Sequence, residues 1–213
     1  MKLARKLLLA AAISSCSSTV LVEVSPRMVL DREKTIGIVA FDVQGSESGA
    51  LDVTSRFVEA LQEGQPGIPV IELGSSAEVL AAAGRTRLDA EALRAIGEKF
   101  DVDRVIVGTL TLQESKPKVD VSLGQVFESG SLHAQVRLDG SLDAKLFDTE
   151  RGATLWTGSS SRWIELASMS GSTAGFGSIG VADLERQVDQ LVYDMVQETS
   201  CDFRPTWERR PAP

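Results

Sequence analysis

The sequence predicts an α/β (α+β) fold: a mixed β-sheet packed by helices, with a long antiparallel hairpin and a C-terminal amphipathic helix. Strand-like and helix-like segments alternate between residues 34 and 112, as they do in layered α/β sheets. A period-2 pattern then runs through residues 132–146, which indicates a strand with one solvated face. Apolar residues at helical spacing between 184 and 196 indicate the last helix.

The first half of the domain is predicted to run strand, helix, strand, helix, helix, strand. Short β-branched runs indicate the strands, of which the first two are expected to be buried. The first helix should end at Gly64, the second should begin at a cap on Ser75 or Ser76, and the third at a cap on Asp89. The expected strands are 34–43, 68–73 and 103–112, and the expected helices are 53–64, 75–84 and 89–100.

The second half is predicted to be antiparallel. Residues 118–123 alternate in polarity, and "ESGS" at 128–131 is a candidate hairpin loop before the long strand 132–146. That strand is long enough to expect a bulge or bend at Gly140. "TERG" should turn the chain so that 153–166 pairs back, and the composition of 168–180 predicts a loop.

The N-terminus has the three parts of an export signal, expected to be removed as residues 1–15. Basic residues precede an apolar run over 7–13, which is too short to span a bilayer as a helix. "ISSC" at its end resembles a bacterial lipobox, so Cys16 is the predicted lipidation site and 16–33 a lipidated tether, with "TVLVEV" as a candidate edge strand. The alternative is an ordinary secretory signal with an incidental Cys16. A lipid would hold the protein at a membrane surface. Ser17 after the cysteine favours the outer membrane by analogy with lipoprotein sorting.

The charge of the chain disfavours nucleic acid as a partner. Loss of the signal removes Lys2, Arg5 and Lys6, which takes the formal net charge from −8 to −11, and a strongly acidic protein repels phosphates. Cys201 is the second cysteine; it is expected to be a partly buried free thiol, with an intermolecular disulfide as the alternative. The tail, residues 201–213, holds three prolines and is expected to be disordered or, less often, a docking peptide.

Residues with catalytic or metal-binding potential are few. His133 is the one histidine and is expected on the polar face of its strand, without a catalytic partner nearby in sequence. The pairs Asp101/Asp103 and Asp139/Asp143 are expected to serve as solvated charges. We therefore predict no catalytic residues, no metal and no cofactor, and the protein is not expected to be an enzyme.

"GFGSIG" spells GxGxxG at Gly175, Gly177 and Gly180. A dinucleotide site requires this loop inside a βαβ unit, with an acidic residue about 20 positions further on. The helix that follows leads only into the proline-rich tail, so no nucleotide is expected. We interpret the glycines as a hinge before the last helix, whose first turn carries Asp183 and Glu185.

The order of these segments resembles the curli assembly/transport lipoprotein (CsgG-like) group and its relatives, the lipoprotein activators of penicillin-binding proteins and the TolB N-terminal domain. The resemblance rests on the lipobox, on "DRVIVGTL" and on "LFDTERGATLWTGSSSR", and it covers most of residues 34–200. It implies a domain on the periplasmic face of the outer membrane that acts without catalysis, through an envelope protein partner, with a homo-oligomer as one form that it could take. The alternative that it implies is a subunit of an oligomeric curli-type secretion channel in that membrane.

Overall fold

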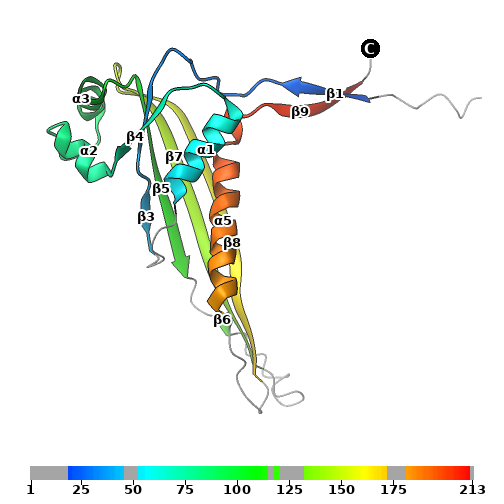
Figure 1. Cartoon of the computed structure of the whole chain (residues 1–213). Helices are drawn as coiled ribbons and strands as arrows, with labels where there is room; N and C mark the ends of the chain where they lie inside the picture. The colour runs from blue at the N-terminus through cyan, green and yellow to red at the C-terminus, as the bar shows by residue number, and fades with distance from the viewer. Residues whose placement is uncertain (1–18, 46–51, 115–117, 120–131, 172–180, 212–213) are drawn as a thin grey trace, which may run out of the picture.

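The computed structural model describes residues 19–45, 52–114, 118–119, 132–171 and 181–211. It confirms the predicted fold class: an open mixed sheet of seven strands is packed by helices, and a separate two-stranded antiparallel sheet joins the two ends of the described chain (Figure 1). Cys16, the 128–131 loop and the GxGxxG glycines lie outside the described residues.

The parallel half of the sheet follows the predicted order. Strand β2 (Ile36–Val39) lies between β4 (Val70–Gly74) and β5 (Arg104–Glu114), parallel to both. The expected strand 34–43 is in fact interrupted, because β3 (Asp42–Gln44) pairs separately with β5. The expected burial of the second strand is wrong: β4 is an edge strand and most of it is exposed.

The antiparallel half is a long hairpin of β7 (Leu132–Asp148) and β8 (Ala153–Gly171), with the short β6 (Lys118–Val119) beside the start of β7. The predicted bulge at Gly140 is wrong, since the register shifts instead between Val136 and Arg137 and between Leu146 and Phe147. A Cβ on Gly140 would lie 3.0 Å from Cε of Met195. The glycine therefore makes room for the helix above the strand. Strand β8 also extends to Gly171, past the expected start of a loop at 168.

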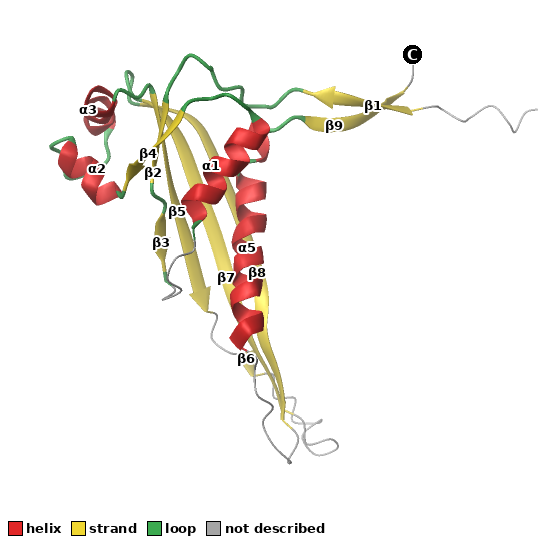
Figure 2. Ribbon diagram, in the orientation of Figure 1, coloured by secondary structure: helices red, strands yellow, loops and turns green. Residues whose placement is uncertain are grey.

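Among the described helices, two lie on each face of the sheet. Helices α1 (Val53–Gly64) and α5 (Val181–Thr199) lie on one face, while α2 (Ser76–Ala82) and α3 (Ala90–Phe100) lie at one end of the other (Figure 2). Ser75 and Asp89 cap α2 and α3 as the sequence predicts. Their side chains accept a hydrogen bond from the third residue of each helix, which satisfies a backbone donor that has no partner within the helix.

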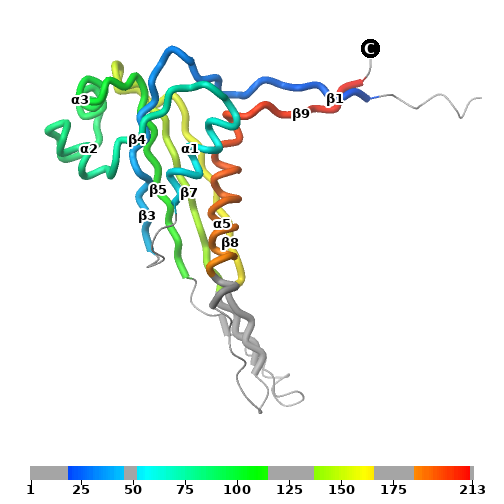
Figure 3. The backbone as a smooth tube through the Cα atoms, in the orientation of Figure 1, coloured from blue at the N-terminus to red at the C-terminus, as the bar shows by residue number. Residues whose placement is uncertain are grey.

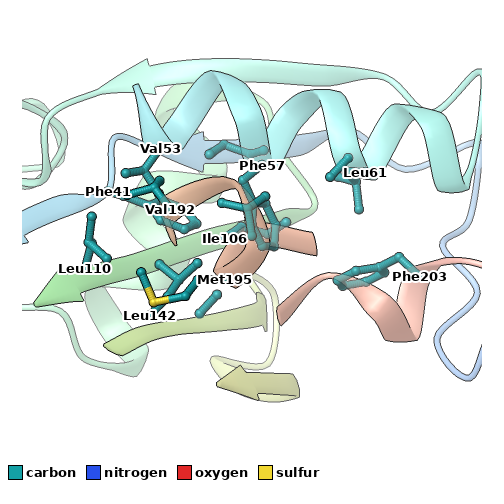
Figure 4. Packing of buried hydrophobic residues seen from close by; sticks show 14 of the residues in the cluster. Phe41, Val53, Phe57, Leu61, Ile106, Leu110, Leu142, Val192, Met195 and Phe203 are labelled. Atoms are coloured by element: carbon teal, nitrogen blue, oxygen red, sulfur yellow. The ribbon is translucent and has the colours of Figure 1, made fainter. Parts of the chain in front are cut away.

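The larger core lies between the sheet and the helix pair α1 and α5 (Figure 4). Aromatic rings run through it in a chain: Phe41, Phe57, Trp156 and Phe203 have successive centroid distances of 5.1, 6.5 and 4.6 Å. Such pairs add about 0.5–1.5 kcal/mol each beyond the area that they bury. Phe203 belongs to a 3-10 turn, η1 (Cys201–Phe203), and is fully buried, so the core holds the start of the predicted tail.

The C-terminal residues differ from the expected disordered tail. Strand β9 (Thr206–Pro211) pairs with β1 (Thr19–Val24) over six residue pairs. Figure 3 shows this ribbon leaving the body crosswise to the long strands. Cys201 is exposed, and the expected partly buried thiol is therefore wrong.

Candidate interaction surfaces

The outward face of β5, β7 and β8 carries mainly hydroxyls and charges, beyond the part that α2 and α3 cover. Side chains alternate along β7, so that Leu142 and Leu146 are buried in the core while Asp139, Asp143 and Lys145 are exposed. The register continues this second face onto β8, where Lys145, Asp143 and Ser141 lie opposite three hydroxyl residues, Thr157, Ser159 and Ser161. We refer to these outward-facing residues of β5, β7 and β8 as the open face.

A hollow of about 540 Å³ lies at the end of the open face that is nearest α2. Asp42 on β3 and Asp143 on β7 are both register partners of Thr109 on β5, and Lys145 on β7 pairs with Val107, two residues away along β5. Apolar lining comes from Leu88, Val107 and Phe147. Two carboxylates, a hydroxyl and an ammonium can accept and donate hydrogen bonds to polar groups of a protein partner.

The predicted carboxylate pairs do not form acid–base pairs. Asp139 and Asp143 share a face of β7 four residues apart, a separation of about 13 Å along a strand. Asp103 accepts from the backbone N–H of Thr35 at 2.9 Å, and its carboxylate is 3.7 Å from Nζ of Lys34. Asp101 ends α3 in a left-handed conformation. Asp101 and Asp103 therefore serve local structure.

An exposed tryptophan lies further along the open face. Trp163 is 56% exposed, and the guanidinium carbon of Arg137 lies 3.7 Å from its ring centroid. Such a cation–π contact stabilises by about 0.5–1 kcal/mol at an exposed site. One face of the indole is thus occupied by arginine.

Strand β8 has a free edge within the described part of the chain. It pairs with β7 on one side, and no other described strand pairs with it over its 19 residues. An unpaired strand edge presents backbone N–H and C=O groups that can add a strand from another chain. This edge borders the open face directly.

The ribbon of β1 and β9, referred to below as the arm, is the second surface. Opposite residues share a face, so Leu21, Glu23, Trp207 and Arg209 lie on one side, and Val20, Val22, Glu208 and Arg210 lie on the other. Leu21 and Trp207 are each 62% exposed. Arg210 and Glu208 form an exposed ion pair at 3.2 Å.

The base of the arm is fixed to the body by one buried side chain. Gln65, which ends α1, accepts from the backbone N–H of Leu30 at 2.7 Å and donates to the carbonyl oxygens of Met28 and Phe203. Next to it, Nε1 of Trp156 donates to Asp202 at 3.1 Å. The two segments that lead into the arm are therefore held together where they leave the core.

Some predicted positions lie outside what the structure describes. His133 is placed in β7 opposite Ser170, but its side-chain environment belongs to the part of the chain that is not described. The GxGxxG glycines lie between the end of β8 and the start of α5. The next described strand after α5 is β9, which pairs with β1 rather than with the main sheet, so these elements do not form a βαβ unit.

The described residues hold no group of three or more His, Cys, Asp or Glu side chains that could bind a metal ion. Among the helices of this described part, none has both the length and the apolar character needed to cross a membrane.

These surfaces belong to a mixed α+β module with one polar sheet face and a projecting arm. No family model matches the chain, and no curated protein matches it. Similar solved structures include the PelC dodecamer from Paraburkholderia phytofirmans, with 12% identity over 88% of this chain and 98% of that chain and a TM-score of 0.42. Lipoprotein GNA1162 from Neisseria meningitidis is 18% identical over 76% of this chain and 96% of that chain, with a TM-score of 0.34.

The C-terminal domain of LpoB from Salmonella enterica is also similar, with 14% identity over 65% of this chain and 84% of that chain and a TM-score of 0.35. A minor lipoprotein from Acinetobacter baumannii shows 10% identity over 78% of this chain and 84% of that chain, with a TM-score of 0.28. Two of these four proteins are thus named as lipoproteins. All four TM-scores are below 0.5, so the similarity says nothing about function, and the resemblance to the curli group remains a prediction.

Proposed function

We propose that this protein is an outer-membrane-anchored periplasmic lipoprotein that acts without catalysis, through contacts with an envelope protein in assembly, secretion or the control of peptidoglycan synthesis. The observation that carries the proposal is the open face together with the free edge of β8. A partner strand added at this edge would place its own side chains beside the hydroxyls and charges of the open face.

The anchor is proposed to be a lipid on Cys16. It is supported by the lipobox-like "ISSC" and by the short apolar run before it. Growth with a labelled fatty acid should label the wild-type protein and leave Cys16→Ala unlabelled. Label that persists on Cys16→Ala would contradict lipidation at this residue, and Cys201→Ala is the matched cysteine control.

The contact surface can be tested by site-specific photo-crosslinking in cells. A benzoylphenylalanine at Ser159 lies on the open face, whereas one at Gln62 lies on the exposed side of α1. We expect a discrete cross-linked protein from position 159 and none from position 62. Identical products from both positions, or none from 159 and its neighbour 161, would refute the open face as the contact surface.

A channel subunit is the second candidate function, and the length of the β7–β8 hairpin favours it. Its strands have 17 and 19 residues. Strand β5 pairs with β7 only from Leu138 onward, so the hairpin continues past its core-packed part, and about 9–11 residues suffice for one membrane crossing by a strand. Single-channel conductance of the purified, detergent-solubilised protein tests this candidate. A monomer or dimer that never conducts would remove it.

A further inference from the structure

The arm has the side chains of a membrane-interface element. Leu21 and Trp207 lie on one side of it, each 62% exposed, and Arg209 lies opposite Leu21 on the same side. Across an antiparallel pair, such opposite and diagonal neighbours lie about 5–8 Å apart. Together with Glu23, which lies opposite Trp207 on the same side, these side chains form one small amphipathic patch.

The arm also lacks the support that a two-stranded ribbon needs. A lone ribbon of this kind is marginally stable in water, and all six residues of β9 are exposed. Most of β1 is exposed too, with Val22 and Val24 half-buried. Contact with another surface would therefore stabilise the arm most on the side that bears Leu21 and Trp207.

The position of the arm along the chain identifies that surface. Two residues, Ser17 and Ser18, separate Cys16 from the start of β1 at Thr19. Even when fully extended, this link spans about 11 Å at most. If Cys16 carries lipid, Thr19 cannot lie further than this distance from the headgroup region. Leu21 lies two residues beyond Thr19, and Trp207 lies on the paired strand opposite Glu23.

We infer that the arm lies on the phospholipid surface beside the anchor, with Trp207 and Leu21 at the level of the headgroups and Arg209 toward lipid phosphates. Tryptophan is favoured at this depth because its ring is apolar and its N–H can reach a polar partner. Arginine can bury its methylene chain while its guanidinium stays among the phosphates. The inference rests on the proposed lipid anchor for its geometry.

The arm would then set the orientation of the whole molecule. Its base is fixed to the body through Gln65 and the buried Phe203. Because the arm leaves the body crosswise to β7 and β8 (Figure 1), an arm that lies flat on the membrane holds the long strands at a fixed angle to its own axis.

The experiment uses quenching by brominated phospholipid, which reduces the emission of a tryptophan in contact with the lipid. The chain offers a matched pair, because Trp163 on the open face is 56% exposed and Trp207 on the arm is 62% exposed. The mature chain from Ser17 retains every described residue and lacks the lipidated cysteine. It is mixed with vesicles of phosphatidylethanolamine and phosphatidylglycerol, with and without bromine.

We expect quenching in the wild type and in Trp163→Phe, and its loss in Trp207→Phe. Leu21→Ser combined with Trp207→Ser should weaken vesicle binding by about tenfold or more. Quenching that survives Trp207→Phe, or that is absent from the wild type at saturating lipid, would overturn the inference. A shift of Trp207 emission with protein concentration in the absence of lipid would do the same, because it would place a second copy on the arm.

The result is separable from that of the labelling experiment. If Cys16 incorporates fatty acid but quenching does not depend on Trp207, the anchor stands and the inference fails. If Cys16 incorporates none but quenching still depends on Trp207, the proposed anchor fails while the arm retains its affinity for lipid.

Discussion

Replacing Gln65 by methionine should destabilise the protein by about 2–6 kcal/mol, although the two side chains have similar volumes and helix propensities. The loss comes from three hydrogen bonds that methionine cannot make. The N–H of Leu30 and the C=O of Phe203 belong to buried residues. Each buried polar group left without a partner costs about 1–3 kcal/mol, and two such groups give the stated range.

The measurement is urea denaturation followed by circular dichroism, with Gln62→Met as the control. Gln62 lies on the same helix and is exposed, so its replacement should change the free energy of unfolding by no more than about 0.5 kcal/mol. In Gln65→Met, hydrogen exchange of the arm amides should also accelerate more than that of the β5 amides. Equal losses of stability in the two variants would refute the role assigned to Gln65.

Three further predictions concern the body of the protein. Gly152 and Gly67 both have positive φ, but a Cβ on Gly152 would lie 2.6 Å from Cβ of Ala90, whereas one on Gly67 would meet nothing within 4 Å. In thermal unfolding, Gly67→Ala should therefore lose about 1–2 kcal/mol of stability, and Gly152→Ala should lose clearly more. Equal losses would contradict the crowding at Gly152. The hydroxyl of Ser160 donates to the carbonyl of Met195 at 3.0 Å and lies 2.8 Å from Oγ1 of Thr199, so Ser160→Ala should cost about 1–2 kcal/mol in urea denaturation, while the exposed neighbour Ser161→Ala should cost less than about 0.5 kcal/mol. The backbone N–H of Ala92, and then Arg87, hold the pKa of Asp89 below its usual range. The resulting stabilisation is complete above the ordinary aspartate pKa of about 4 and is lost as the pH falls through the lower pKa of the folded state. The difference in stability between wild type and Asp89→Asn should therefore shrink on acidification, and a difference that does not change with pH would contradict this linkage.

Local signals predicted much of the fold. The caps at Ser75 and Asp89, the alternation along β7 and the apolar stripe of α5 each depend on residues close in sequence, and the structure confirms them. The bulge at Gly140 was a wrong inference because strand length was the only evidence. A glycine can equally mark a close approach by another element, here Met195 of α5, and this contact joins residues 55 positions apart.

The interaction surfaces were harder to predict than the elements that carry them. The alternation in 132–146 predicted a polar face, but only the register with β5 and β8 shows which polar residues lie together. The arm was missed because Pro205, Pro211 and Pro213 made the tail resemble a disordered segment. The run "TVLVEV" predicts an edge strand, and β1 confirms it, but its partner β9 lies at the other end of the described chain and local residues could not identify it.

The pairing of β1 with β9 also has a consequence for biosynthesis. Thr19 and Pro211 are register partners, so the arm can form only after the last described residues have been synthesised. Synthesis that stops a few residues before 206 would leave a chain whose body is nearly complete but whose arm cannot form. Such a chain would expose the bare β1 strand, and an untied terminal segment of this kind is a preferred site of proteolysis.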